Sequence, residues 1–363
     1  MRYSRQKNLL EIGDIGQQKL LKSSVLCIGA GGLGSPALLY LAAAGIGRIG
    51  IIDFDRIDES NLQRQIIFST SALGQSKASE AKKNLSALNP TIQIDAYNEE
   101  LDSESAARLF PLYDIILDGT DNFETKFLIN DAAIKYGKPL IYGAIQGFDG
   151  QASVFGYKGG PCYRCLYPQK PKAQIMNCAE AGVIGAVAGI VGITQALQTI
   201  QIIVDHDSFH PLAGKMWMID SRTMETRILN IPKNPKCPSC GHKTNKDNII
   251  LQYTSPVCSF TAEISVTDLQ GRHGHLLIDV REQDEWDNGH INGAILWPLS
   301  RIANGDIPEE MRDEEVIVYC QRGARSLQAA TILKEHGFAD VTSLSGGYIA
   351  WLESLKLSSE VPS

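Results

Sequence analysis

The sequence has no excess of positive charge. Its 34 lysines and arginines are outnumbered by 41 aspartates and glutamates, which leaves a formal net charge of −7 over 363 residues. A surface without surplus cations cannot neutralise many phosphates, so we expect no nucleic acid partner.

A secretory signal and an unbroken membrane-spanning run are also missing. The N-terminus, MRYSRQKNLL, is polar, and the longest apolar stretch, residues 181–204, is interrupted by glycines, threonines and glutamines. We therefore predict a helix buried within a protein and no membrane partner.

Cysteine is scarce as well, with eight in the chain. This favours a reducing cytoplasm, where disulfides are rare and a C-x-x-C pair serves a metal or a redox reaction.

Strand and helix patterns alternate through the first part of the chain. Apolar strands such as SSVLCIG and RIGIIDFD are separated by helical stretches such as SKASEAKKNLSAL. Alternation of this kind predicts an α/β fold with a doubly wound, mainly parallel, Rossmann-like sheet over residues 1–245. A mixed polar stretch, 246–260, predicts a linker, and residues 261–363 predict a second, smaller α/β domain.

A glycine-rich turn, GAGGLG (29–34), follows the first predicted strand and precedes a helix. Glycines at such a turn let a phosphate approach backbone N–H groups, and Asp53 ends the next strand, where a carboxylate can bond ribose hydroxyls. These features alone favour NAD and ATP about equally.

Charged and amide side chains downstream favour ATP over NAD. Asn61, Arg64 and Lys77 follow the second strand, and Asp121 and Asn122 follow a later one in DGTDN. Cations suit phosphates, and a carboxylate at a strand end can hold Mg²⁺ against them. The alternative is that Arg64 and Lys77 are ordinary surface cations.

The segments around these residues resemble the MoeB/ThiF family, relatives of the ubiquitin-activating enzymes, over about residues 1–240. The resemblance implies an adenylyltransferase that uses ATP and Mg²⁺ on the C-terminal glycine of a ubiquitin-like sulfur carrier protein ending in Gly-Gly. It assigns Arg64 and Asp121 to catalysis and Arg5 to the phosphates of a neighbouring subunit, and so implies a homodimer. The nucleotide-contacting residues implied are Arg5, Gly32, Asp53, Ser60, Asn61, Leu62, Gln63, Arg64, Lys77, Asp121 and Asn122.

Two C-x-x-C pairs, Cys162/Cys165 and Cys237/Cys240, lie in turn-forming sequence. Four thiolates suit a closed tetrahedral Zn²⁺ site, which leaves no position open for substrate and therefore predicts a structural role. A redox role is the alternative. The family resemblance implies the same four ligands.

Three further cysteines receive different interpretations. Cys178, in MNCAEAG, matches a family cysteine linked to thioester or persulfide transfer, although a small buried residue is an equal alternative. Cys27 lies within a strand and is expected to pack in the core. No role is predicted for Cys258.

The segments LLIDVREQDEWDNGHINGAILWPL and VIVYCQRGARS resemble rhodanese, a sulfurtransferase domain, over about residues 261–357. Cys320 leaves a buried strand and opens a loop before a helix, where backbone N–H groups with Arg322 and Arg325 favour a thiolate or persulfide. Asp279 and Arg281 are expected to form a structural polar pair.

The two resemblances together imply one reaction sequence. The first domain adenylates the carrier, and a Cys320 persulfide, loaded by a cysteine desulfurase or by thiosulfate, converts it to a thiocarboxylate for molybdopterin biosynthesis. A thiamine or tRNA-thiolation carrier is an alternative within this class. An NAD-dependent oxidoreductase with a regulatory rhodanese module and a non-catalytic carrier-binding scaffold are alternatives outside it.

Overall fold

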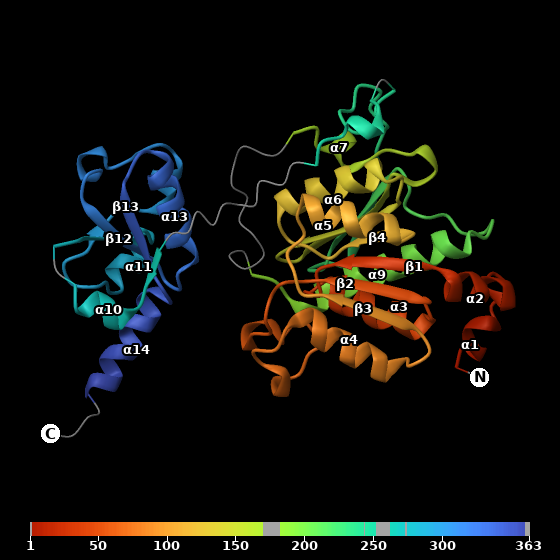
Figure 1. Ribbon diagram of the computed structural model, residues 1–363, viewed down its shortest axis with the longest axis horizontal. Helices are drawn as coiled ribbons and strands as arrows, with labels where there is room; N and C mark the ends of the chain where they lie inside the picture. Colours follow the sequence, from red (N-terminus) through yellow and green to blue (C-terminus); the bar gives the residue numbers. More distant parts are fainter. Residues whose placement is uncertain (1, 170–181, 243, 252–261, 273, 360–363) are drawn as a thin grey trace. The chain divides into compact units, whose positions relative to one another are not determined.

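The computed structural model describes residues 2–169, 182–242, 244–251, 262–272 and 274–359 (Figure 1). The chain divides into two compact units, Met1–Thr254 and Ser255–Ser363, called here the first and second units.

The first unit is built on an eight-stranded sheet with strand order β3-β2-β1-β4-β5-β6-β7-β8. Strands β1 to β5 run parallel, while β6, β7 and β8 extend the sheet antiparallel. The predicted mainly parallel sheet is therefore confirmed. The strands are β1 (Ser24–Ile28), β2 (Arg48–Ile52), β3 (Gln93–Tyr97), β4 (Ile115–Asp118), β5 (Leu140–Gln146), β6 (Asp149–Phe155), β7 (Lys215–Asp220) and β8 (Glu225–Asn230).

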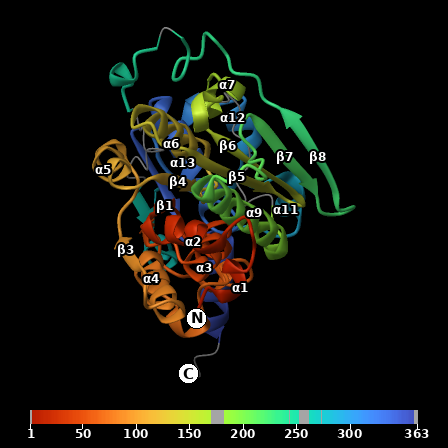
Figure 2. The same ribbon diagram turned by 90° about the vertical axis from the view of Figure 1, so that its right-hand side faces the viewer.

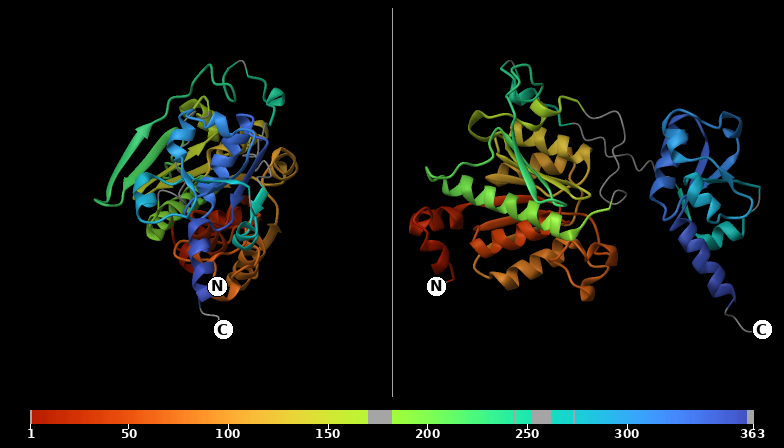
Figure 3. Two further views of the ribbon diagram at one scale, coloured as in Figure 1. Left: turned by 90° about the vertical axis from the view of Figure 1, so that its left-hand side faces the viewer. Right: turned by 180° about the vertical axis from the view of Figure 1, so that it is seen from behind.

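Helices cover both faces of this sheet (Figures 1 and 3). Side chains alternate between the faces of a strand, so in β1 Val25 and Cys27 enter one apolar core while Leu26 and Ile28 enter the other. The first core is closed by α2 (Gly13–Lys22), α3 (Gly34–Ala44), α4 (Lys77–Leu88) and α9 (Gly185–Val204), and the second by α5 (Ser103–Leu109) and α6 (Phe123–Lys135). Two short helices, α1 (Ser4–Lys7) and α7 (Tyr163–Leu166), complete the unit. Cys27 is fully buried in the core, as expected.

The apolar stretch that the sequence predicts as a buried helix forms α9. Within the described residues it is the one helix long and apolar enough to cross a membrane, and 56% of its most apolar window is buried inside the protein. Its polar side chains are used internally, since Gln195 Nε2 donates to the carbonyl oxygens of Asp118 and Ile141 at 2.7 and 3.2 Å. These contacts are those of a helix packed on a sheet.

The outer edge of the sheet is exposed. The β7–β8 hairpin extends from the body of the unit in Figure 2. All six residues of β8 are exposed, and Ile228 and Leu229 are among them.

The second unit contains a five-stranded parallel sheet of order β11-β10-β12-β13-β9. Apolar side chains from both faces pack under helices, so this unit has its own core. Its strands are β9 (Ala262–Ile264), β10 (Leu276–Asp279), β11 (Ile295–Leu296), β12 (Glu315–Tyr319) and β13 (Asp340–Leu344). Its helices are α10 (Val266–Gln270), α11 (Gln283–Asp287), α12 (Leu299–Ala303), α13 (Ala324–Glu335) and α14 (Gly347–Ser359).

The segment expected as a linker, 246–260, begins packed against the first unit. Lys135 Nζ of α6 donates to the carbonyl oxygen of Ile249 at 2.6 Å, and Ser103 Oγ of α5 donates to that of Leu251 at 2.8 Å. Residues up to Leu251 therefore belong structurally to the first unit.

Candidate nucleotide and sulfur sites

The glycine turn after β1 is held in a shape that side chains would prevent. Gly29 has φ +89°, and a Cβ at Gly34 would collide with the carbonyl oxygen of Gly29. The turn after β4 lies directly beside it, because a Cβ at Gly119 would come within 2.7 Å of the same oxygen. The turn that carries Gly32 and the loop that carries Asp121 and Asn122 thus meet at the carboxyl edge of the sheet, where ligands of doubly wound folds bind.

Asp53 ties the glycine turn to the end of β2. Its Oδ2 accepts the N–H of Ala30 at 2.8 Å, and its Oδ1 accepts the N–H of Asp55 at 2.9 Å. Burial raises the pKa of Asp53, and the hydrogen bond from Ala30 and the charge of Lys77 partly offset this. A carboxylate oxygen has two lone pairs, so both can still accept a ribose hydroxyl.

Arg64 lies against the glycine turn. Its Cγ and Cδ atoms are 3.5 Å from where a Cβ of Gly32 would be, and its Nη1 donates to the carbonyl oxygen of Ser60 at 2.9 Å. Ser60 and Asn61 belong to a short 3-10 turn in which Asp58 Oδ1 accepts the N–H of Ser60. Leu62 packs into the core, and Gln63 is exposed.

Lys77 is not a surface cation. Its side chain is 6% exposed, and Nζ lies 2.8 Å from Oδ2 of Asp55, two residues after Asp53. The alternative interpretation of an ordinary surface residue is therefore wrong for Lys77. Its charge is already paired by Asp55, so a phosphate would have to share it.

The β4 loop presents an exposed carboxylate. Asp121 is exposed, while Asn122 accepts the N–H of Thr125 at 2.8 Å and so caps α6. Beneath them Asp118 Oδ1 accepts the N–H of Thr120, and Asp118 Oδ2 pairs with Lys126 Nζ at 2.8 Å. This buried ion pair fixes the start of the loop.

Arg5 does not reach the glycine turn of its own chain. Its neighbour Gln6 donates to the carbonyl oxygen of Ala44 at 3.2 Å, which puts α1 at the C-terminal end of α3. The glycine turn lies at the other end of that 11-residue helix, about 16 Å away at 1.5 Å per residue. The structure therefore separates Arg5 from the other predicted phosphate contacts.

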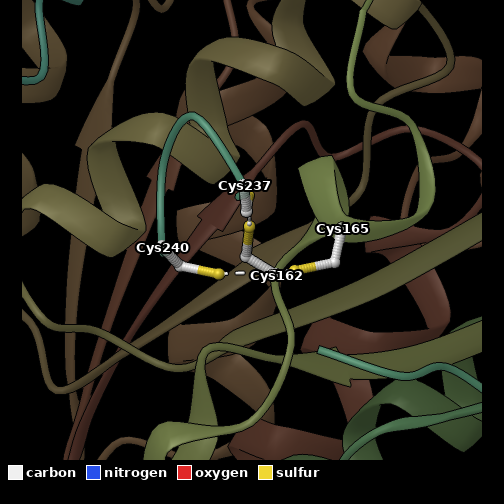
Figure 4. Close-up of side chains that lie close together, drawn as sticks. All are labelled: Cys162, Cys165, Cys237 and Cys240. Atoms are coloured by element: carbon white, nitrogen blue, oxygen red, sulfur yellow. Dashed lines mark hydrogen bonds between the residues drawn. The ribbon is translucent and has the colours of Figure 1, made fainter. Parts of the chain in front are cut away.

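The four cysteines of the two C-x-x-C pairs converge in the first unit (Figure 4). Their sulfur atoms all lie within 4.8 Å of one another, with 3.5 Å between Cys162 and Cys237 and 3.4 Å between Cys165 and Cys240. Cys162 and Cys237 are buried. Hydrogen bonds from Cys162 and Cys240 lower the pKa of Cys237, so the cluster favours at least one thiolate.

A polar network holds this cluster in place. Asp131 on α6 accepts two hydrogen bonds from Arg164, at 2.7 and 2.6 Å, and one from Ser239 Oγ at 2.7 Å. Arg164 lies between the cysteines of one pair and Ser239 between those of the other, so a single carboxylate positions both. The N–H of Asn234 also donates to Cys165 Sγ at 3.4 Å.

In the second unit Cys320 directly follows β12 and opens the loop that leads into α13. The N–H of Gly323 donates to its Sγ at 3.1 Å, and Ser326 Oγ lies 3.7 Å from the same sulfur. Gly347 packs closely against the backbone of Cys320, since a Cβ at Gly347 would collide with the carbonyl oxygen of Cys320. A sulfur held by N–H and O–H donors is suited to carry negative charge.

The two loop arginines differ from each other. Arg322 is exposed, whereas Arg325 makes two hydrogen bonds of 2.6 Å to the carboxylate of Glu285. Arg325 does interact electrostatically with Cys320, as expected, but its pairing with Glu285 offsets part of its positive charge. The sequence gives no sign of this pair, which joins positions 40 residues apart.

Asp279 and Arg281 form the expected structural pair. They are fully or almost fully buried, with 2.7 Å between Arg281 Nη2 and Asp279 Oδ2. Arg281 Nη1 also donates to Gln321 Oε1 at 2.9 Å, so the pair supports the loop directly after Cys320.

Two cysteines singled out in the sequence, Cys178 and Cys258, lie outside the described residues. Sequence reasoning also missed residues that the structure places at the sites, namely Asp55, Lys126, Asp131 and Glu285. Their signal is spatial, because each acts through a partner that only the fold brings next to it.

Comparison with protein families agrees with this division of the chain. Residues 3–239 match the ThiF family, and residues 265–354 match the rhodanese-like domain.

Similar proteins align over 69–98% of the chain. The "probable adenylyltransferase/sulfurtransferase MoeZ" of Mycobacterium tuberculosis is 39% identical, over 98% of this chain and 93% of its own. The "adenylyltransferase and sulfurtransferase MOCS3" of Anopheles gambiae is 38% identical, over 98% and 87%. The "sulfur carrier protein adenylyltransferase" of Thermus thermophilus is 42% identical, over 69% of this chain and 93% of its own.

Solved structures share the fold of the first unit. Escherichia coli MccB, crystallised with ATP, aligns with a TM-score of 0.57 at 24% identity and covers 66% of this chain and 74% of its own. PaaA aligns with a TM-score of 0.55 at 22% identity, over 64% and 73%.

Proposed function

Because the chain belongs to the ThiF family, carries a rhodanese-like domain and is an enzyme of the adenylyltransferase and sulfurtransferase class, we propose that it converts the C-terminal glycine of a ubiquitin-like sulfur carrier protein to a thiocarboxylate. One observation carries the proposal. Side chains suited to a nucleoside triphosphate gather at the glycine turn of the first unit, and the second unit holds a cysteine sulfur among hydrogen-bond donors.

The adenylation step follows from the residues at the glycine turn. A carrier carboxylate oxygen bonds to the α-phosphorus of ATP, the bond to the β-phosphate oxygen breaks, and pyrophosphate leaves. Arg64 and Lys77 stabilise the charge that builds on the phosphates, and Asp53 orients the ribose. Asn61 and Asn122 contribute amide groups at the two ends of the site. A Mg²⁺ ion held by the exposed carboxylate of Asp121 would neutralise further phosphate charge.

Sulfur transfer would begin at Cys320. Its persulfide attacks the carbonyl carbon of the carrier acyl-adenylate, AMP leaves, and an acyl disulfide forms. A second thiolate, for which we propose Cys178, then attacks the Cys320 sulfur. The disulfide bond breaks, the carrier departs as a thiocarboxylate, and a Cys178–Cys320 disulfide remains to be reduced.

We assign Zn²⁺ to the four-cysteine cluster. Tetrahedral Zn–S bonds of about 2.3 Å require sulfur atoms roughly 3.8 Å apart, close to the 3.4 and 3.5 Å contacts present. Asp131, Arg164 and Ser239 supply the outer hydrogen bonds expected around such a site. A redox pair would need two sulfurs rather than four.

A homodimer completes the nucleotide site in this proposal. Arg5 lies at the far end of α3 from its own glycine turn, so it would reach the phosphates of a second copy. Mixing inactive Arg5→Ala and Arg64→Ala chains tests this, because each heterodimer then holds one intact site. An equal mixture should recover about a quarter of the wild-type activity, whereas sites within single chains would recover none.

The carrier is expected to bind near the sheet edge formed by β8. Exposed Ile228 and Leu229, with the unpaired backbone of an edge strand, are typical of a protein-binding surface. We place the reaction in molybdopterin biosynthesis and in the cytoplasm, with thiamine or tRNA-thiolation carriers as the alternative.

Two other functions receive less support. An NAD-dependent oxidoreductase would not need Arg64 beside the glycine turn or the buried Lys77 paired with Asp55. A carrier-binding scaffold would not need a cysteine sulfur surrounded by donors.

ATP–pyrophosphate exchange with a carrier ending in Gly-Gly tests the first step. We expect Asp121→Ala and Arg64→Ala to abolish exchange nearly completely. The matched control is Arg56→Ala, because Arg56 is an exposed arginine nearby that bonds the carbonyl oxygen of Gly74. Reduction of NAD without any exchange would show that the proposal is wrong.

A further inference from the structure

Arg325, at the start of α13 after the Cys320 loop, forms a two-fold ion pair with Glu285. Its Nη1 and Nη2 each donate to one carboxylate oxygen of Glu285 at 2.6 Å, and both side chains are 28% exposed. Hydrogen bonds to Glu285, and after them the charges of Glu285 and Cys320, raise the pKa of Arg325 above its usual value. The guanidinium therefore lies within electrostatic range of the Cys320 sulfur.

The charges around Cys320 consequently nearly cancel. Arg281 is paired with Asp279 and Arg325 with Glu285, and Arg322 is exposed, with no carboxylate partner among the described residues. Arg322 is then the one arginine of the loop whose charge is not paired within the described part of the chain. Such a loop has little attraction left for a donor that carries two negative charges.

Sulfur donors differ in this respect. Thiosulfate is a dianion: the thiolate attacks its outer sulfur, the S–S bond breaks, and a sulfite dianion leaves as the cysteine persulfide forms. A persulfide on another protein carries one negative charge or none, and it leaves behind a cysteine thiolate. The first reaction needs cations at the loop far more than the second does.

We infer that Glu285 is a specificity-determining residue of the Cys320 site. By pairing with Arg325 it withholds one cation from the loop, and the site then discriminates against small dianionic donors in favour of a persulfide carried by a protein. This inference rests on the proposed sulfurtransferase function and specifies its donor.

The test is the variant Glu285→Gln in the full-length protein. Glutamine can still accept the N–H of Glu282, which Glu285 receives at 3.3 Å in the capping box of α11, so the helix start is retained. Asp284→Asn is the matched control, because it removes the same charge from the adjacent residue of the same helix. Thiosulfate with cyanide as acceptor is one assay, and loading of Cys320 from a persulfide on purified cysteine desulfurase is the other.

We expect Glu285→Gln to raise kcat/KM for thiosulfate about tenfold, mainly through KM, since the freed cation attracts a dianion through partly screened space. The gain should shrink with added salt and disappear in Glu285→Gln/Arg325→Gln. Loading from the protein persulfide should be unchanged.

Two results would overturn the inference: a Glu285→Gln variant with the wild-type kcat/KM for thiosulfate, or an Asp284→Asn variant with the same gain, which would indicate a general charge effect. If neither donor loads sulfur onto Cys320 in the wild-type protein, the proposed sulfurtransferase function fails and the inference fails with it.

Discussion

Replacing Lys126 with methionine tests whether the buried ion pair under the β4 loop holds the nucleotide site together. Lys126 and Asp118 are 5% and 1% exposed, and Lys126 Nζ also donates to the carbonyl oxygen of Gly143 at 2.9 Å. Removal of one partner from such a pair leaves a buried charge uncompensated, which costs about 3–5 kcal/mol. We therefore expect Lys126→Met to lower the free energy of unfolding of the first unit by that amount.

The expected functional loss has a separate cause. Asp118 Oδ1 accepts the N–H and the hydroxyl of Thr120, at 2.9 and 2.6 Å, so a displaced Asp118 would misplace the loop that carries Asp121. Pyrophosphate exchange should fall together with stability.

Guanidinium unfolding, followed by hydrogen exchange of the β4 and β5 peptides, measures the stability change in the first unit alone. Lys83→Met is the matched control, because Lys83 pairs with Glu80 on α4 but is 72% exposed, and such pairs contribute only about 0.2–0.5 kcal/mol. The double variant Asp118→Asn/Lys126→Met should regain part of the loss. Equal small losses for Lys126→Met and Lys83→Met would refute the reasoning.

Four other perturbations follow from the geometry. Cys240→Ser should release the bound metal and lower the melting temperature by more than about 5 °C; unchanged zinc content would contradict this. Gly34→Ala should cost at least about 1–3 kcal/mol and reduce exchange, since its Cβ would strike the carbonyl oxygen of Gly29, and normal exchange would argue against a fixed turn. Cys320→Ala should keep adenylation but form no thiocarboxylate. It should also lose the gain of about 32 Da, one sulfur atom, that mass spectrometry detects on the protein after donor treatment. Thiocarboxylate formed at the wild-type rate would reject the persulfide role. The hydrogen bond from Arg325 lowers the pKa of Glu285 below its usual 4.5. The pair therefore stabilises the second unit fully above pH 4.5 and less as the pH falls through the lowered pKa. Glu285→Gln should reduce the pH dependence of the free energy of unfolding in acid, and an unaltered dependence would contradict this.

Much of the architecture could be predicted because its signals are local. The apolar strand, the glycine turn and the following helix are consecutive in residues 24–44. The two C-x-x-C pairs are recognised from the spacing of their cysteines. The direction of the sheet follows from the alternation of strands and helices.

The partners of charged residues could not be predicted in the same way. In the sequence Lys77 cannot be distinguished from a surface cation, because nothing there shows its pairing with Asp55, 22 positions away. The pairing of Arg325 with Glu285 depends likewise on how α11 and α13 pack. Charge in a motif is visible in the sequence, whereas its neutralisation depends on the fold.

The four-cysteine cluster would also affect the unfolded chain if it bound a metal ion there. Each sulfur pair joins positions 75 residues apart, and α9, β7 and β8 all lie inside the loop so closed. Closing a flexible loop of that length costs about 4 kcal/mol of chain entropy, from (3/2)RT ln n. If an ion stayed bound to the unfolded chain, the entropy cost of closing the loop would already have been incurred before folding. The ends of the loop would then be held together before β7 pairs with β6. The cluster would then act as a reversible cross-link that sets the order in which the antiparallel strands β6, β7 and β8 assemble.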